Sequence, residues 1–332
     1  MGRLKIVYPV CCGMDVHRDF LIACIAATNA QGVAEYQSRR FSTYTGSLRE
    51  LRDWLLANDC KDVCMESTGK YWFPVHNILE ESCHVVVSHP KFVKAIKGKK
   101  TDKKDAQWIA DLFKHDLVRG SFIPPKDIRQ LRDLCRYWVK LSSYMTGEKN
   151  RAQNCLTVSN FKLDDVFSNV FGKSASAITT QLLEHPGEQF DVAPFVDGRC
   201  KTPIAQIQEA VDGIFTYEQA EKLKIIRGHM DSLERHKAEL ESLILEIAQN
   251  YLPQIELLLT VPGIHDAFTA IRILAEIGAD MTVFDTSKHL CSWAGLTPQN
   301  AESAGKKKTT RIGKSGAYLK PLLVQVALAA SR

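Results

Sequence analysis

Short apolar runs broken by turn residues occupy the first forty positions of the chain. Two runs, IVYPVCCGMDV and FLIACIAAT, flank the polar triplet His17-Arg18-Asp19, which is the pattern of a strand, a turn and a second strand. Turn residues from Asn29 to Gly32 then precede VAEYQSRRFST, where a third strand is expected. The chain is therefore predicted to begin with a meander of three strands.

Helical periodicity then alternates with two further strand-like segments. LRELRDWLLAND, DVCMEST and HVVVSHP are predicted as a helix and the fourth and fifth strands, with another helix over about residues 71–81. A last helix is predicted over residues 102–115, since its apolar residues share one face: Ala106, Ile109, Ala110 and Phe113. This order of elements is that of an α/β RNase H-like fold.

The middle of the chain has the spacing of long helices. A helix over 128–158 is predicted from apolar residues at heptad-like intervals: Leu131, Leu134, Trp138, Leu141 and Met145. Residues 160–215 contain three prolines, and their pattern orders into no clear fold. The clearest repeat is a seam of eight positions in steps of three and four, seven of them apolar: Leu223, Ile226, Met230, Leu233, Lys237, Leu240, Ile244 and Ile247.

This seam predicts a helix that ends before Pro253, and it leaves the partner of the helix open. The helix could pack on its own domain, or it could form a coiled coil with the 128–158 helix or with another subunit. The polar Lys237 would restrict the register of such a pairing.

The C-terminal part is predicted to be mainly α-helical. LLLTVPGIHDAFTAIRILAEIG resembles a helix-hairpin-helix, whose turn at Pro262-Gly263-Ile264 is either a phosphate contact or an ordinary tight turn. A helix is predicted over 284–296, followed by a polar, basic and glycine-rich segment. The apolar helix predicted over 317–332 has no polar tail, so the chain is expected to be truncated there or to have a tail that is processed or disordered.

Composition and charge narrow the class of protein. The 332 residues are 45% hydrophobic with a net charge of +5, but the basic residues cluster: seven lysines and one acid lie in 91–104, and six basic residues and no acid lie in 306–320. Local clusters of this kind favour nucleic-acid binding. The ten scattered cysteines indicate reduced, mostly buried thiols, and the spacing of Cys60, Cys64, Cys83 and His84 argues against a zinc site. No apolar run is long enough to span a membrane.

Carboxylates at the ends of two predicted strands are the first candidates for chemistry. Asp15 ends VCCGMD, where Gly13 permits close approach of another segment, and Glu66 ends DVCME. Burying such a carboxylate costs free energy of hydration, and this cost is offset only if the carboxylate is paired or binds a metal. Asp102 and Asp105 share one face of the next helix. Although acids are common at strand ends and helix starts, these four together predict a site for divalent cations.

Basic residues and other acids surround these carboxylates. The lysines beside the aspartate pair are interpreted as contacts for nucleic-acid phosphates: Lys97, Lys99, Lys100, Lys103 and Lys104. Asp19, Asp111 and Asp116 are interpreted as surface or turn residues.

Ser303, in NAESAGKKK, is a candidate nucleophile. It precedes the second basic cluster, which consists of Lys306, Lys307, Lys308, Arg311 and Lys314. Cations so close to the serine in sequence could stabilise the charge that forms when the serine attacks phosphorus. Spacing alone favours a phosphate-binding loop with an incidental serine, and Ser315 is a rival in the same segment.

Several segments together resemble the DEDD transposases of bacterial insertion sequences, which are bridge-RNA-guided recombinases. The segments are GMDVHRDF, MESTGKYW, KTDKKDAQWIADL, LLLTVPGI and FDTSKHLCSWAGLTPQNAESAGKKKTTRIGKSGAYLK. The combination is specific, whereas no single segment is. The serine motif reads Ser-Ala-Gly where many relatives have Ser-Gly-Gly.

The resemblance implies three domains. They are a RuvC-like catalytic domain over 1–125, a helical linker with a coiled coil over 126–252, and a mainly α transposase domain with the serine loop over 253–332. It implies that Mg²⁺, as two ions, is bound by Asp15, Glu66, Asp102 and Asp105. It further implies that Ser303 forms a covalent phosphoserine with DNA.

The implied partners are donor and target DNA, a structured non-coding guide RNA and further copies of the chain. The carboxylates and the serine would come from different subunits of a dimer, or of a tetramer on DNA, in the bacterial cytoplasm at the nucleoid. A RuvC-like endonuclease that uses water, and a non-catalytic nucleic-acid-binding protein, are the alternatives. The presence of all four acids disfavours the second of these.

Overall fold

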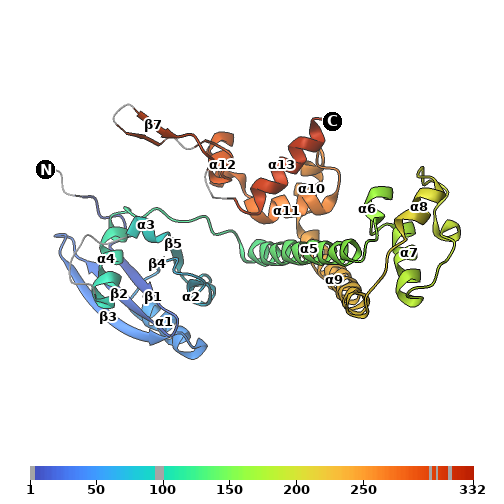
Figure 1. Ribbon diagram of the computed structural model, residues 1–332. Coiled ribbons are helices and arrows are strands. Elements are labelled where there is room, and N and C mark those ends of the chain that lie inside the picture. The colour runs from blue at the N-terminus through green and yellow to red at the C-terminus, as the bar shows by residue number, and fades with distance from the viewer. Residues whose placement is uncertain (1–3, 94–100, 299–300, 304–305, 313–315) are drawn as a thin grey trace. The chain divides into compact units, whose positions relative to one another are not determined.

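The structure, a computed structural model, divides into two compact units, residues 1–123 and 124–332 (Figure 1). It describes residues 4–93, 101–298, 301–303, 306–312 and 316–332, and for 301–303 and 306–309 the backbone alone. The first unit contains the predicted carboxylates, and the second contains Ser303. In the described ranges no helix has the length and apolar character needed to cross a membrane. The predicted division into three domains stays a prediction.

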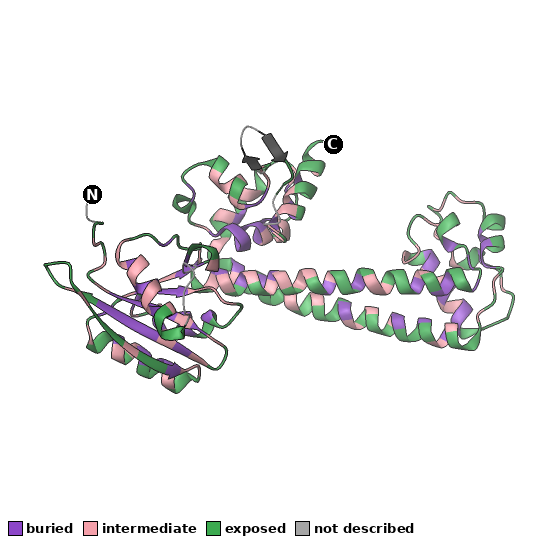
Figure 2. Ribbon diagram, turned by 60° about the vertical axis from the view of Figure 1, so that its left-hand side comes forward, coloured by how far each residue is buried: buried purple, intermediate pink, exposed green. Residues whose placement is uncertain are grey.

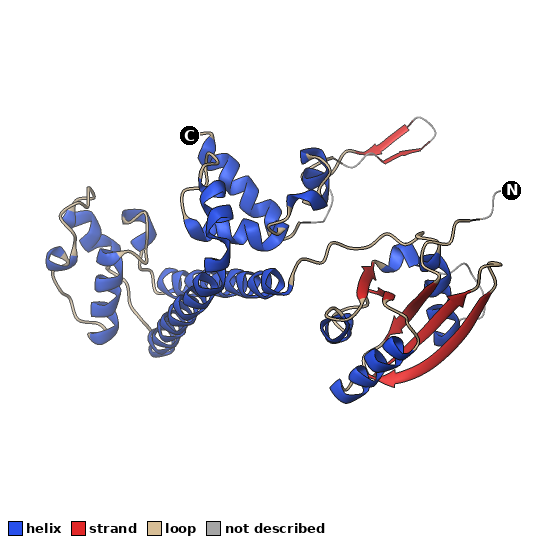
Figure 3. Cartoon of the chain, turned by 180° about the vertical axis from the view of Figure 1, so that it is seen from behind, coloured by secondary structure: helices blue, strands red, loops and turns tan. Residues whose placement is uncertain are grey.

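A five-stranded mixed sheet forms the centre of the first unit (Figure 3). Its strands are β1 (Val10–Val16), β2 (Phe20–Thr28), β3 (Ala34–Ser42), β4 (Asp62–Glu66) and β5 (His84–Ser88), in the order β3-β2-β1-β4-β5. The first three pair antiparallel, and β4 and β5 add in parallel beside β1. This strand order is the RNase H-like fold that the sequence predicts.

Helices cover both faces of this sheet. α1 (Thr45–Ala57) and α2 (Trp72–Leu79) pack on one face, in a core with Cys12, Met14 and Val16 of β1. α4 (Asp102–Lys114) covers the other face, where Cys11 lies among buried residues of α4. The short α3 (Pro90–Val93) follows β5. Because alternate residues of a strand point to opposite faces, Asp15 lies on the α4 face.

Gly13 allows α4 to lie directly on β1. A Cβ built on Gly13 would stand 2.3 Å from the carbonyl oxygen of Ala106 and 2.3 Å from the amide nitrogen of Ala110. Real Cβ atoms do not come this close to backbone, so only glycine fits here. The close approach expected at Gly13 is confirmed, and its partner is the backbone of α4.

Two long helices of the second unit, α5 (Lys126–Val158) and α9 (Tyr217–Ala248), lie side by side (Figure 2). They run antiparallel, since Trp138 of α5 donates to Glu241 of α9 while Glu148 of α5 lies by His229 of α9. All eight seam positions of α9 are buried or half-buried. The partner of the seam is thus the predicted 128–158 helix of the same chain.

The polar seam residue Lys237 has an aromatic partner. Its Nζ lies 4.7 Å from the ring centroid of Trp138, on which Arg272 also lies at 5.2 Å. Further along, Leu233 packs on Leu141 and Met145 of α5. A charged residue is tolerated at Lys237 because its ammonium group lies over an aromatic ring.

Residues 160–215, which the sequence pattern left unordered, form a small helical cluster. Its elements are α6 (Leu163–Val166), α7 (Lys173–Glu184), η1 (Ala193–Phe195) and α8 (Ile204–Ala210). Their buried side chains share one core with the adjoining ends of α5 and α9. Such short helices are held by tertiary contacts and show little periodicity of their own.

The C-terminal part begins with η2 (Gln249–Tyr251), α10 (Leu252–Leu259) and α11 (Ala267–Ile277), which confirm the predicted helical hairpin. Its turn packs closely on α13 (Leu319–Ala330). A Cβ on Gly263 would stand only 2.2 Å from the carbonyl oxygen of Val326, so glycine is required at this contact. The helix predicted over 284–296 is shorter. η3 (Met281–Val283) precedes α12 (Ser287–Trp293), which begins where Thr286 accepts from the His289 amide.

Two features complete the second unit. β6 (Ala301–Ser303) and β7 (Lys306–Thr309) form an antiparallel hairpin in the basic segment. Arg136 of α5 donates two hydrogen bonds of 2.7 Å to the carboxylate of Glu276 in α11. Arg132 donates to the carbonyl oxygens of Ala275 and Glu276. These bonds join α11 to α5.

Candidate metal centre

The end of β1 positions the first two residues of the candidate site. Asp15 lies in β1 on the face that α4 covers, and His17 directly follows the last residue of this strand, Val16. The turn after them closes with a hydrogen bond of 2.9 Å from the His17 amide to the carbonyl of Phe20. His17 Nε2 lies 3.1 Å from Oδ2 of Asp15. Asp15 is the more enclosed of the two, with 14% of its side chain exposed against 38% for His17.

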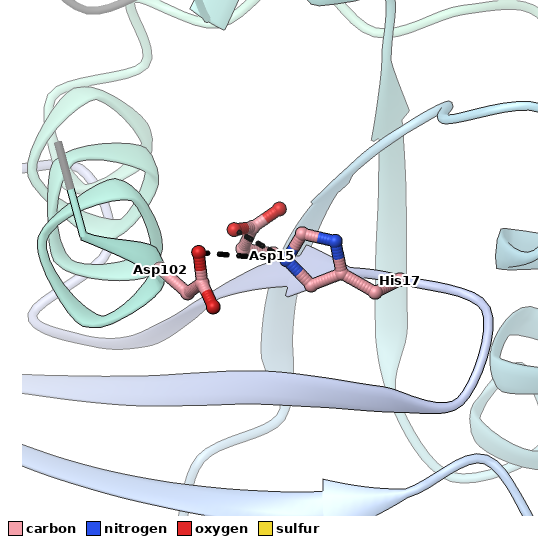
Figure 4. Close-up of side chains that lie close together, drawn as sticks. All are labelled: Asp15, His17 and Asp102. Carbon is pink, nitrogen blue, oxygen red and sulfur yellow. Dashed lines mark hydrogen bonds and ion pairs between the residues drawn. The ribbon is translucent and has the colours of Figure 1, made fainter.

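The first turn of α4 brings acidic residues to the same place. Thr101 caps this helix, its Oγ1 accepting from the Lys104 amide, and Asp102 and Asp105 follow in the first turn. Asp102 Oδ1 lies 3.8 Å from His17 Nε2. One potential ligand atom from each of Asp15, His17 and Asp102 lies within 4.8 Å of the others (Figure 4). The structure thus brings two of the four predicted carboxylates together, and adds a histidine.

Burial raises the pKa of the Asp15 carboxyl above its ordinary value. The charge and hydrogen bond of His17 lower this pKa, while the charges of Asp102 and Asp105 raise it. Among the described residues, His17 is the one basic side chain within 4 Å of the Asp15 carboxylate. The negative charge at Asp15 is therefore poorly compensated, as is expected where a cation binds.

Glu66 lies on the strand next to Asp15. β1 and β4 pair in parallel as far as Met14 and Met65, so Asp15 and Glu66 follow on neighbouring strands at one edge of the sheet. The Glu66 carboxylate accepts a hydrogen bond of 3.1 Å from Thr68 Oγ1. Glu66 and Asp105 are outside the group of three, and their role as metal ligands stays a prediction.

The donor atoms of this group suit a divalent cation. Carboxylate oxygens are the hard ligands that Mg²⁺, Ca²⁺ and Mn²⁺ take, and an imidazole nitrogen is accepted by Mn²⁺ and other transition metals. The enclosed, poorly compensated carboxylate of Asp15 is the observation that fits such an ion. Asp15 and Asp102 would hold it, with His17 beside them.

His17 is the residue that sequence reasoning missed. The sequence pattern places it in a turn between two strands, because it begins the polar triplet His17-Arg18-Asp19. Its signal is its position two residues after Asp15, just beyond the end of the strand, where an imidazole can reach the carboxylate.

The other nearby acids have separate roles. Asp19 is 82% exposed in the turn, and Asp116 is exposed with a φ of 56°, so both are surface or turn residues as interpreted. Asp111 differs, since it is half-buried on α4 and accepts from Lys114 and Tyr36. This difference arises because α4 lies against the edge strand β3, where the Tyr36 hydroxyl reaches the Asp111 carboxylate.

The cysteines form no competing metal site in the described part of the chain. All ten are unpaired, and eight of them are buried. Burial raises the pKa of Cys64 to about 12, so its thiol stays protonated at neutral pH.

The predicted nucleic-acid contacts are described in part. Lys103 and Lys104 are exposed in the first turn of α4. Ser303 pairs with Lys306 in the β6–β7 hairpin, and Arg311 is exposed beyond it. The backbone of Lys307 and Lys308 lies in β7. The remaining predicted residues lie outside the described ranges: Lys97, Lys99, Lys100, Lys314 and the rival Ser315.

Two protein-family models match the chain. Residues 12–160 match the DEDD transposase model of the IS110 group, which is described as a transposase. Residues 255–332 match the model described as the transposase IS116/IS110/IS902 family. The first match includes the four predicted carboxylates, and the second includes Ser303. No match was found among curated proteins.

Solved structures that resemble part of the chain include two of RuvC and one of a viral resolvase. The Thermus thermophilus RuvC structure is 14% identical over 34% of this chain and 99% of that chain, with a TM-score of 0.28. The same protein in complex with a Holliday junction substrate is 12% identical over 34% and 99%, with a TM-score of 0.26. The fowlpox virus resolvase with Holliday junction DNA is 14% identical over 31% and 72%, with a TM-score of 0.22. These TM-scores are too low to assign a fold, so the RNase H-like assignment rests on the strand order of the sheet.

Proposed function

Because the chain belongs to the IS110 family of DEDD transposases, we propose that it is an RNA-guided DNA recombinase that uses Ser303 as its nucleophile. The observation that carries the DNA-cleaving part is the meeting of Asp15 and Asp102 at one edge of an RNase H-like sheet. The family match over the serine segment supports the rest.

In the proposed reaction, the Ser303 hydroxyl attacks a phosphorus atom of the DNA backbone. A bond forms between Ser303 Oγ and phosphorus, the serine proton passes to a base, and the bond from phosphorus to the leaving deoxyribose oxygen breaks as that oxygen takes up a proton. Attack by a hydroxyl of another strand reverses these steps and releases the serine. The number of phosphodiester bonds is conserved, so strand exchange needs no external energy source.

The acidic group supports this reaction through divalent cations, proposed to be two Mg²⁺ ions. When bound, they would neutralise charge on the scissile phosphate. Asp15 and Asp102 are proposed to hold them, with Glu66 and Asp105 completing the set. The exposed Lys103 and Lys104 would contact neighbouring phosphates.

The proposed partners are donor and target DNA, a structured guide RNA from the same element, and further copies of the chain. The carboxylates lie in the first compact unit and Ser303 in the second. A composite site in a dimer or tetramer would let the carboxylates of one subunit act with the serine of another.

Covalent adducts test the role of the serine. Wild-type protein with labelled DNA, its guide RNA and Mg²⁺ is expected to form a protein–DNA adduct that survives denaturing electrophoresis. Ser303→Ala should lose the adduct and strand exchange, whereas Ser315→Ala should retain both. Adduct and exchange in Ser303→Ala would contradict the serine mechanism. Cleavage by Ser303→Ala without any adduct would instead favour a RuvC-like nuclease that uses water.

A further inference from the structure

Arg40, on the edge strand β3, lies in the same row of the sheet as Asp15. The register pairs Asp15 with Ile22 of β2, and Ile22 with Arg40. Directly paired residues point to the same face, so Arg40 projects on the α4 side. Two strand spacings of ~4.8 Å put its Cα about 10 Å from that of Asp15. The backbone of Arg40 is therefore in the row of the sheet that ends in the acidic site.

Aromatic contacts connect Arg40 to the metal-binding group. The Arg40 guanidinium carbon lies 4.0 Å from the ring centroid of Phe20. The Phe20 ring in turn lies 4.7 Å from that of His17, which contacts Asp15. A ring under a guanidinium restricts its orientation and leaves its N–H groups available at the edges. Phe20 thus orients Arg40 at the margin of the site.

The hydrogen-bonding capacity of Arg40 is unused within the described residues. Arg40 is exposed, and in the part of the chain that the structure describes its guanidinium has the Phe20 ring as partner and neither a carboxylate nor a hydrogen-bond acceptor. Its neighbour Arg39 differs, since it points to the opposite face, lies 4.8 Å from the Phe41 ring and is 3.9 Å from Glu50. Arg40 therefore presents N–H donors to an external acceptor.

A second cation lies beside the acids. Lys103 directly follows Asp102 in the first turn of α4 and is exposed. α4 packs on β2 as well as on β1, so its first turn lies on the side of the sheet to which Arg40 projects.

We propose that Arg40, positioned by Phe20 and helped by Lys103, binds a phosphate of the DNA strand that enters the acidic site. The carboxylates repel DNA, and cations at their margin offset this repulsion. One strand carries a charge per ~3.4 Å of duplex axis, so the ~10 Å between Arg40 and Asp15 corresponds to a phosphate a few nucleotides from the bond that is cut. The inference rests on the proposed function and adds a substrate-contacting residue to it.

The affinity of the protein for labelled DNA, measured with a chelator present so that the DNA stays uncut, tests this subsite. The probe is a fluorescein-labelled single-stranded DNA, with an RNA of the same sequence for comparison. Arg40→Gln is expected to weaken DNA binding about tenfold, as for loss of a charged hydrogen bond. It should also reduce the slope of log K against log salt by roughly 0.7, the value for one phosphate on a single strand. Arg40→Lys should restore the salt slope and part of the affinity.

Two variants separate the role of Arg40 from general effects. Arg39→Gln removes the same charge from the opposite face and should leave affinity and salt slope unchanged. Phe20→Leu keeps the charge but removes the ring, and should weaken binding without changing the slope. Equal losses in Arg39→Gln and Arg40→Gln would overturn the subsite, as would a loss of RNA binding alone. An unchanged Arg40→Gln beside an inactive Asp15→Asn would also overturn it while leaving the proposed function intact.

Discussion

The carbonyl oxygen of Ala106 in α4 occupies the space that a side chain on Gly13 of β1 would need. A Cβ on Gly13 would stand only 2.3 Å from this oxygen. Asp15 is two residues beyond Gly13, and Asp102 is one helical turn before Ala106. The contact therefore sets the distance between the strand end and the helix start that together form the acidic group.

Gly13→Ala should separate these two acidic elements. The added methyl group has to push α4 away, since both neighbouring atoms are backbone, and overpacking of this kind costs ~1–3 kcal/mol of unfolding free energy. A displacement of ~1 Å at a catalytic site can lower activity about 100-fold. Denaturant unfolding and a DNA-cleavage assay measure the two effects.

Gly46→Ala is the matched control, because a Cβ on Gly46 meets nothing within 4 Å. Gly46 lies in the first turn of α1, where alanine suits the helix. Activity in Gly13→Ala equal to that in Gly46→Ala would show that the α4 contact does not hold the site together.

Sequence patterns predicted the sheet because its signals are local. Alternating apolar residues, turn residues and the acids at the ends of β1 and β4 lie within short segments, and the parallel pairing of these strands brings Asp15 and Glu66 to one edge. The order of elements then restricted the topology to one familiar arrangement.

The approach of Asp102 to Asp15, and the positions of His17 and Arg40, depend on tertiary contacts. The close approach of α4 to β1 requires a glycine at position 13, and Arg40 joins the row of Asp15 through the register of two strand pairs. Residues 160–215 were unpredictable for a related reason, since their short helices share a core with α5 and α9. Single-sequence periodicity carries no information about such pairings.

Asp15→Asn should stabilise the cation-free protein. Burial raises the folded-state pKa of Asp15 above its unfolded value, so its contribution to stability is fully present below the unfolded pKa and is lost as pH rises through the folded pKa. At neutral pH the ionised carboxylate is therefore unfavourable in the fold, and the amide removes that cost. Thermal unfolding in a chelator across pH 4 to 8 should show a higher Tm and a flatter pH dependence in the variant.

Divalent cations should make the wild-type protein more stable than Asp15→Asn, the reverse of the order expected in a chelator. At about 100 times its Kd, a bound cation stabilises the wild-type protein by ~2.7 kcal/mol, and Asp15→Asn should lose most of this gain. Asp19→Asn, which changes an acid that is 82% exposed in the adjoining turn, should keep it. Equal stabilisation of both variants by Mg²⁺ and Mn²⁺ would place the ion elsewhere.

Leu233→Ala should destabilise the helical pair without changing the number of subunits. Leu233 is buried at 4% exposure against Leu141 and Met145 of the same chain, so its truncation should cost ~2–5 kcal/mol. Ile225→Ala, on the same helix but 73% exposed, should cost less than ~0.5 kcal/mol. Denaturant unfolding and light scattering measure stability and mass. Dissociation of an oligomer by Leu233→Ala would show that the seam also joins subunits.

Glu276→Gln should loosen α11 from α5. The Glu276 side chain is 10% exposed and accepts two hydrogen bonds from Arg136, which is itself 40% exposed. Solvent at Arg136 reduces the cost of breaking this pair below that of a fully buried pair, to ~1–2 kcal/mol. Glu221→Gln breaks an exposed pair with Lys224 and should cost less than ~0.5 kcal/mol. Urea denaturation compares the two variants, and equal costs would mean that the Arg136 pair contributes no more than a surface pair.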